Sequence, residues 1–251
     1  MNANPLAGAG SIFRREMLLF RLKLARPSFV LSTMITPLMY MVVFGLGLGR
    51  QVRVDGGDYL SFLVPGLMGM AAMHNSFNWV ASGLNIARFY HRTWQLVMLA
   101  PVSPVAVVAG NVGAGMARGL IATLLVGVAG LAAGWRPEPS VALPLALLLE
   151  TALFAAIGMV IGLKTRGMEE HTTYTNFVIT PMGFFCGTFF PLSNLPGWLS
   201  GPLHLLPLTH ANIALRQPGL TAEALWALAA LTAFAVALLA AAVWVVARYR
   251  E

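Results

Sequence analysis

The chain has 251 residues, of which 58% are hydrophobic and 10% charged, with a formal net charge of +7. A soluble domain carries about a quarter charged residues, so this composition excludes a water-soluble enzyme. Long apolar runs recur along the chain, and a membrane-spanning helix needs about 20 such residues. The stretches left between those runs reach about 30 residues at most, too few for a globular head. The composition therefore predicts an all-α polytopic membrane protein, with residues 1–251 forming one transmembrane domain.

The first element expected is an amphipathic helix over residues 12–26, with apolar side chains on one face and basic side chains beside them. A basic amphipathic helix of this kind lies in the membrane interface, and we favour that over a cytosolic helix. The longest apolar run in residues 1–26, from Met17 to Phe20, is too short for a signal-peptide core, so we expect the start of the chain to be retained. The apolar residues recur at steps of three and four and are Phe13, Met17, Phe20 and Leu24.

Six apolar runs predict six transmembrane helices, near residues 28–49, 60–86, 104–134, 141–163, 172–190 and 222–247. The lysines and arginines outside these runs divide into eleven on one side and four on the other. Because positive charge marks the cytoplasmic side, we expect both termini in the cytoplasm. The net positive charge then reports topology, and no nucleic-acid partner is expected.

Two connections between the expected spans have unusual compositions. Residues 87–103 mix basic and aromatic side chains, which suits either docking of another protein or an aromatic–basic belt at the bilayer surface. Residues 191–221 contain five prolines and one charged residue, Arg216. Proline at this density forbids one continuous helix, and so apolar a loop is poorly solvated by water. We therefore expect short interfacial or re-entrant helices on the outer side.

Motifs for several kinds of chemistry are absent from the sequence. Neither lysine follows a glycine, so the phosphate-binding Gly-Lys-Ser/Thr loop of an ATPase is missing. The five histidines form no His-Glu-x-x-His pair for zinc, and no Gly-x-Ser-x-Gly elbow is present. We expect no catalytic residue, metal or cofactor on this chain.

Ionisable and polar residues inside the spans are the functional candidates. Arg118 and Glu150 fall in consecutive spans and could pair, although residue count separates them by about 10 Å in depth. We favour a structural ion pair or an arginine that extends toward the interface. The second span carries a polar stripe at helical spacing, which either lines a passage or joins helices by hydrogen bonds. Its residues are His74, Asn75, Asn78, Ser82 and Asn85.

Residues 180–216 resemble the signature region of the permeases of type-2 ABC exporters. The resemblance rests on residues 187–192 (GTFFPL) and 206–210 (LPLTH), with further similarity in residues 93–95 (TWQ) and 99–103 (LAPVS). It covers essentially the whole chain. The branch that contains exporters of nodulation lipo-oligosaccharides and of drugs looks most similar.

The resemblance implies the membrane subunit of an ATP-driven exporter in the bacterial inner membrane. ATP and Mg would bind a separate ATPase subunit, present in two copies, and a second permease copy would complete a homodimer in the lipid bilayer. Residues 12–26 and a coupling loop at 87–101 would dock the ATPase, and residues 191–220 would return into the outer leaflet. The ATPase-coupling candidates are Arg88, Phe89, Tyr90, His91, Arg92, Trp94, Glu169 and Glu170.

We expect the exporter to move an amphipathic or saccharide-containing substrate, such as a drug, a lipid or a lipo-oligosaccharide, outward through the membrane. An intramembrane enzyme using His74, Glu150 or Arg118, or a passive channel, is the alternative function. The residues expected along the substrate pathway are Tyr40, Asn75, Asn78, Ser82, Asn85 and Phe184.

Overall fold

The computed structural model describes residues 5–25, 27–48, 53–54 and 57–249. The longer helices are α1 (Pro5–Leu24), α2 (Pro27–Tyr40), α3 (Tyr59–Asn85), α5 (Pro104–Ala132), α6 (Ala142–Lys164) and α11 (Ala222–Ala247). The shorter helices are α4 (Thr93–Leu99), α7 (Met168–Tyr174), α8 (Thr180–Phe185), α9 (Gly197–Leu203) and α10 (Pro207–Leu215). Wider π-helical turns continue α2, α3 and α7 over Met41–Leu48, Ile86–Tyr90 and Thr175–Ile179, and a 3₁₀ turn covers Leu192–Asn194. Two short antiparallel strands, β1 (Arg53–Val54) and β2 (Gly57–Asp58), precede α3.

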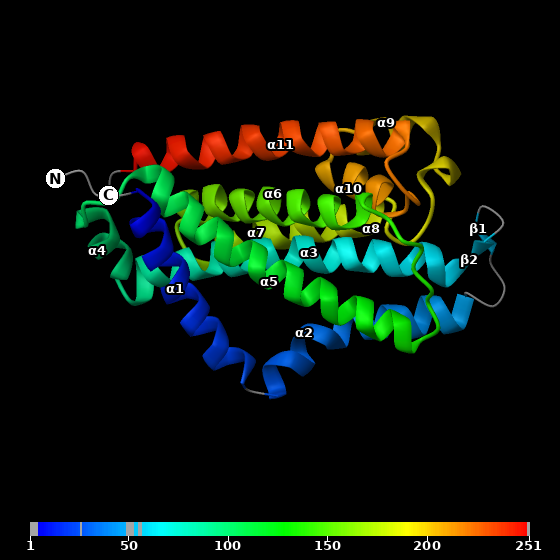
Figure 1. Cartoon of the computed structure of the whole chain (residues 1–251). Helices are drawn as coiled ribbons and strands as arrows, with labels where there is room; N and C mark the ends of the chain where they lie inside the picture. Colours follow the sequence, from blue (N-terminus) through cyan, green and yellow to red (C-terminus); the bar gives the residue numbers. More distant parts are fainter. Residues whose placement is uncertain (1–4, 26, 49–52, 55–56, 250–251) are drawn as a thin grey trace.

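Helix α3 is the centre of the bundle. It packs against both α5 and α6, while α11 covers α6 and α1 covers α5. Helices α3, α5, α6 and α11 run side by side (Figure 1), and α3 is buried continuously from Leu63 to Met73. The polar residues of the second expected span therefore lie on the most enclosed helix of the structure.

Glycines let α5 and α6 approach α3 closely. A Cβ atom on Gly158 of α6 would lie 2.6 Å from the Phe77 carbonyl oxygen of α3. A Cβ atom on Gly119 of α5 would overlap the Ser76 hydroxyl and lie 2.8 Å from a methyl group of Thr151. Small residues of this kind permit tight packing where hydrophobic exclusion no longer drives helices together.

The starts of α5 and α11 have local causes in the sequence. The Ser103 hydroxyl accepts a hydrogen bond from the Ala106 N–H, and Pro104 occupies the first helical position of α5. The Thr221 hydroxyl caps α11 in the same way by accepting from the Ala224 N–H. Such caps satisfy N–H groups that have no partner inside the helix.

The expected spans match the structure unequally. By length and composition, three helices of the described part of the chain could cross a membrane, namely α5, α6 and α11. Helix α3 has 27 residues and matches the expected span 60–86, but its polar side chains make it less apolar. The other two expected spans are helical but not uniformly α-helical, since 28–49 falls on α2 and the π-helical turns that continue it, and 172–190 falls on α7, its π-helical extension and α8.

The first helix is longer than expected and packs on the bundle. It begins at Pro5 rather than at residue 12. Along it, Ile12 lies against Gly110 and Phe13 against Gly113, so α1 runs beside the first half of α5, obliquely to the long helices (Figure 1). Of its apolar stripe, Phe20 is buried, whereas Phe13 and Leu24 remain partly exposed.

The bundle has two distinct ends. The first turn of α1, helix α4 and the last turn of α11 lie at one end, which we call the α4 end (Figure 1). The strands and α9 lie at the opposite end, the α9 end, where the proline-rich segment 191–221 forms short helices as expected.

Candidate functional site

Two cavities flank α3. The α1–α3 cavity, of about 640 Å³, opens between α1, α3, α5 and the segment leading to α4. The α2–α3 cavity, of about 320 Å³, lies between α2, α3 and α8. Both cavities are open, and both are lined by apolar surface with a few polar side chains.

The α2–α3 cavity contains half of the residues expected along the substrate pathway. Tyr40, Asn75 and Phe184 all line it, together with His74. The Tyr40 ring meets those of Phe184 and Phe189 edge-on, with centroids 5.7 and 5.2 Å apart. The Asn75 amide donates to the Ala71 carbonyl of its own helix, 2.9 Å away. The result is an aromatic wall with a few polar groups facing it.

The rest of the polar stripe on α3 is divided between the second cavity and helix contacts. Asn78 and Ser82 line the α1–α3 cavity. The Ser82 hydroxyl also lies 3.0 Å from Nε2 of His171 in α7. Asn85 is fully buried and lines neither cavity, because its amide donates to the Ala81 carbonyl and to the Thr165 hydroxyl. The stripe therefore lines two cavities and also joins helices by hydrogen bonds.

The two intramembrane charges have separate surroundings. The Arg118 guanidinium lies 4.4 Å from the centroid of the Trp79 ring and 5.3 Å from that of Phe20. Glu150 is completely buried, and neither carboxylate oxygen accepts a hydrogen bond from any described residue. The single ion pair within the described ranges joins Arg15 to Glu16, so Arg118 and Glu150 do not form the structural pair that we favoured.

Depth does not explain this separation. Gly119 of α5 lies against Thr151 of α6, which brings the neighbours Arg118 and Glu150 to the same level. The expected offset of about 10 Å is therefore wrong, because residue counting ignores the relative shift of two packed helices. The two side chains part because they leave their helices on different faces, Arg118 toward α1 and Glu150 toward Gly69 of α3.

Lys23, at the end of α1, lies near the same Trp79 ring as Arg118. Its amine lies 4.8 Å from the ring centroid. Burial lowers the pKa of the Lys23 amine, and the adjacent positive charge of Arg118 lowers it further. In the sequence, Lys23 stood out only as one of the basic residues that mark the cytoplasmic side. Helical spacing within α1 could not have shown that it meets Trp79, which lies in a distant segment.

Within the expected coupling segment, residues 87–101, some side chains contact the helix bundle and others are exposed. Trp94 is 1% exposed and meets the Tyr249 ring edge-on, with centroids 6.1 Å apart. Arg88 donates hydrogen bonds to the Tyr249 hydroxyl and to the Gly162 and Thr165 carbonyls at the end of α6. These two candidates therefore hold the segment to the bundle.

Several other side chains of this segment are exposed. Tyr90 and Leu96 are each 68% exposed, Leu99 is 83% exposed, and Phe89 is 43% exposed. We call these four residues the α4 surface. His91 and Arg92 are exposed beside it, and Arg92 has φ +51°, which forms the sharp turn into α4. A left-handed residue other than glycine costs about 1 kcal/mol.

The acidic candidates occupy the start of α7. Glu169 and Glu170 are both exposed in its first turn, where negative charge stabilises a helix. The Glu170 carboxylate accepts a hydrogen bond from the Arg166 N–H, 2.8 Å away. The turn between α6 and α7 also touches Arg88 through Thr165, so both expected coupling regions meet at one place.

At the α9 end, Arg216 and Asn212 form a cluster of hydrogen bonds to backbone carbonyls, which the sequence pattern did not indicate. Arg216 donates to the Phe62 carbonyl of α3 and to the Gly187 and Thr188 carbonyls after α8, at 3.1, 2.7 and 3.3 Å. Gly187 has φ +82°, a conformation that favours glycine. The Asn212 amide donates to the Cys186 carbonyl, 2.8 Å away. The segments 187–192 and 206–216 are thus one packed unit.

These features define a polytopic helical membrane protein whose polar groups line cavities and join helices. Residues 10–220 match the family described as ABC-2 type transporter, and the chain belongs to this family. Membership makes it a membrane subunit of an ABC transporter, as the resemblance predicted.

Curated relatives agree with this family. The chain is 32% identical to the inner membrane transport permease YadH of Escherichia coli K12 over 178 residues, 70% of this chain and 69% of the relative. It is 31% identical to nodulation protein J of Rhizobium meliloti over 209 residues, 82% of this chain and 79% of the relative. It is 28% identical to nodulation protein J of Bradyrhizobium diazoefficiens, over 80% of this chain and 77% of the relative. Apolar helices and relatives named permeases support a multi-pass protein of the inner membrane and a transport role without catalysis on this chain.

Proposed function

We propose that two copies of this chain form the membrane part of an ATP-driven exporter for an amphipathic or saccharide-containing substrate. Each copy spans the membrane six times and docks one ATPase subunit, which binds ATP and Mg. The observation that carries the proposal is the family match over residues 10–220.

The arrangement of the ends supports the six spans. Helices α5, α6 and α11 cross as single helices, and α3 crosses beside them as the polar central helix. Helix α2 and the run α7–α8, each with its π-helical turns, supply the other two spans, and Met34, Met41, Ile179 and Met182 of these runs belong to the same apolar core as α3. The starts of α1 and α4 and the end of α11 share the α4 end, as an even number of crossings requires (Figure 1). The excess of basic residues expected on that side supports a cytoplasmic position for this end.

The α4 surface is the proposed docking site for the ATPase. Exposed aromatic and apolar side chains dominate the energetics of protein interfaces. The surface is held rigidly, because Trp94 is buried below it and Arg88 joins it to α6 and Tyr249. A force applied at α4 therefore reaches α3, α6 and the end of α11 together.

The α2–α3 cavity is the proposed part of the substrate pathway. Its aromatic wall suits the apolar part of an amphipathic substrate, and Asn75 and His74 offer polar groups to the remainder. Helices α2 and α8 border it, and both join π-helical turns, over Met41–Leu48 and Thr175–Ile179.

An intramembrane enzyme has less support from the geometry. Its three candidate residues lie in different places, with His74 at the α2–α3 cavity, Arg118 at the α1–α3 cavity and Glu150 buried beside Gly69. A catalytic site requires such groups within hydrogen-bonding reach of one reacting atom.

The proposal is tested by co-expressing the chain with the ATPase subunit encoded beside it and purifying through a tag on this chain. We expect co-elution at equal stoichiometry and vanadate-sensitive ATP hydrolysis. Leu96→Ser with Leu99→Ser should reduce co-elution at least about tenfold, since about 1.4 kcal/mol of lost contact suffices. The matched control is Leu205→Ser with Leu220→Ser, two exposed leucines of segment 191–221. Equal losses in both pairs, or a chain that binds no ATPase subunit, would overturn the proposal.

A further inference from the structure

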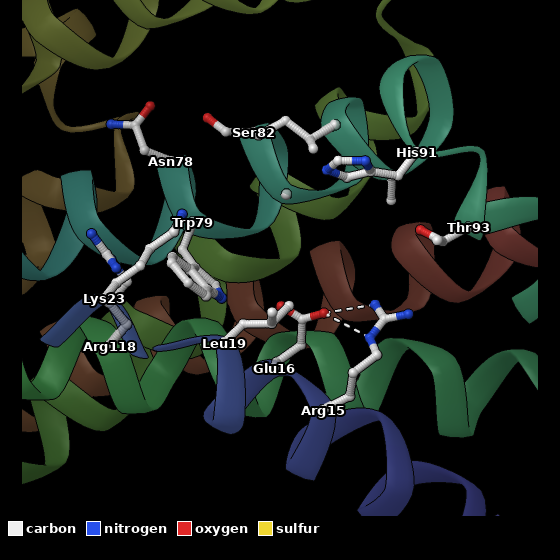
Figure 2. A pocket seen from close by; sticks show the side chains of 13 residues that line it. Arg15, Glu16, Leu19, Lys23, Asn78, Trp79, Ser82, His91, Thr93 and Arg118 are labelled. Carbon is white, nitrogen blue, oxygen red and sulfur yellow. Dashed lines mark hydrogen bonds and ion pairs between the residues drawn. The ribbon is translucent and has the colours of Figure 1, made fainter. Parts of the chain in front are cut away.

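The α1–α3 cavity gathers positive charge at one end. Figure 2 shows Lys23 and Arg118 close to Trp79 at one end of the cavity, with His91 and Thr93 at the other. The two cations lie 4.8 and 4.4 Å from the centroid of the same indole ring. Burial lowers the pKa of the Lys23 amine, and the positive charge of Arg118 lowers it further, because the two cations repel each other.

The charges lining the cavity do not balance. Among the described residues that line it, Glu16 carries the one carboxylate, which already pairs with Arg15, 2.6 Å away. Lys23 has no carboxylate within ion-pairing distance in the ranges that the structure describes. The cavity thus carries a net positive charge from Lys23 and Arg118, which favours an anion.

A hydrogen-bond donor also lacks an acceptor here. The Nε1–H group of Trp79 is buried, and no described residue accepts from it. A buried donor without an acceptor costs about 1–3 kcal/mol. An anion bound between Lys23 and Arg118 would lie beside the indole that carries this donor.

Apolar surface continues from the cavity along α1. Leu19 lines the cavity and is 47% exposed. Leu18 and Leu22 are 60% and 69% exposed, and residues three and four apart on a helix are surface neighbours. A free inorganic anion would make no use of this surface, whereas the acyl chains of a lipid would cover it.

We propose that the α1–α3 cavity binds the phosphate group of an anionic membrane lipid, with Lys23, Arg118 and Trp79 around the phosphate and the acyl chains along Leu18, Leu19 and Leu22. This inference concerns a cavity other than the proposed substrate pathway. It requires no ATPase subunit, so it can hold or fail independently of the exporter proposal.

The test uses the full chain, purified in an uncharged detergent, and titrated by calorimetry with dihexanoyl phosphatidic acid. We expect saturable binding of about one lipid per chain, at least about tenfold tighter than dihexanoyl phosphatidylcholine or inorganic phosphate. Lys23→Gln and Arg118→Gln should each weaken binding about tenfold, and Trp79→Phe, which keeps a ring but removes the N–H, about threefold. Lys23→Arg should restore most of the affinity.

The matched controls are Arg14→Gln and Arg21→Gln, which remove exposed charges of α1 outside the cavity. They should change the affinity less than about twofold, because exposed charges contribute little. If Arg118→Gln does not yield folded protein, Lys23→Gln and Trp79→Phe decide the question alone. Equal losses in the controls would overturn the site in favour of general attraction to a basic helix. Equally tight binding of inorganic phosphate would overturn the assignment to a lipid.

Discussion

Two arginines bind backbone carbonyls at opposite ends of α3. Arg88 holds the Gly162 and Thr165 carbonyls at the end of α6, and Arg216 holds those of Phe62 and Gly187. At the end of α6, the last carbonyls have no intrahelical partner, and the positive charge of Arg88 there also stabilises the helix dipole. Both arginines therefore hold separate segments together, and Arg88, which the resemblance associates with coupling to the ATPase, does so within the expected coupling segment.

Replacing Arg216 should destabilise the α9 end. We expect Arg216→Leu to lower the free energy of unfolding by about 2–4 kcal/mol, because buried carbonyls lose a charged donor. Thermal unfolding in detergent measures the effect. Arg136→Leu removes an exposed arginine of the α5–α6 loop and should change stability by less than about 0.5 kcal/mol. Similar losses for both variants would contradict this role of Arg216.

Within the coupling segment, some residues should affect protein stability and others only binding of the ATPase. Trp94→Ala empties a buried site and should cost about 3–5 kcal/mol of stability. Leu99→Ala changes a side chain that is 83% exposed and should leave the unfolding temperature within about 2 °C. Under the proposed function, Leu99→Ala nevertheless weakens binding of the ATPase. A large stability loss for Leu99→Ala would show that this leucine also packs against the bundle, as Trp94 does.

At the scale of helices, close packing depends on where glycines face. Gly115, Gly119, Gly158 and Gly162 follow the small-xxx-small spacing, and all four face α3. In a lipid environment such contacts rely on dispersion and backbone proximity, which fall off steeply with distance. The bundle can keep a polar central helix because its neighbours approach the backbone of α3 directly.

One substitution, made at two glycines, tests this packing. Gly158→Ala should destabilise the protein by about 1–3 kcal/mol, because its Cβ atom would meet the Phe77 carbonyl at 2.6 Å. Gly83→Ala, on the exposed side of α3 with no atom within 4 Å, should be neutral or stabilising by up to about 1 kcal/mol. Thermal unfolding in the same detergent compares them directly. Equal effects would mean that helix propensity, not close approach, governs both sites.

At the scale of the molecule, the two ends of the bundle should face opposite sides of the membrane. Cys186 is the sole cysteine of the sequence and is buried, so Cys186→Ser provides a background for labelling. In intact cells, a membrane-impermeant maleimide should label Ser193→Cys at the α9 end and not Leu99→Cys at the α4 end. Lysed cells should label both. Labelling of Leu99→Cys in intact cells would reverse the proposed topology.

The long elements were predictable because they depend on local properties. The predicted span 222–247 coincides with α11, and 104–134 and 141–163 differ from α5 and α6 by one or two residues. Apolar length alone decides such helices, and Ser103 and Thr221 set their starts. The π-helical turns of the first and fifth spans were not predicted, since each run is as apolar as a uniform α-helix would be.

The sequence by itself determined the class of protein, the number of apolar runs and the family, because composition and motifs are carried by neighbouring residues. Only the tertiary structure decided which polar groups meet. It separated Arg118 from Glu150, buried Trp94 and Asn85, and brought Lys23 to Trp79. These outcomes depend on the relative shift and rotation of packed helices, which are set by side-chain contacts between segments far apart in the chain.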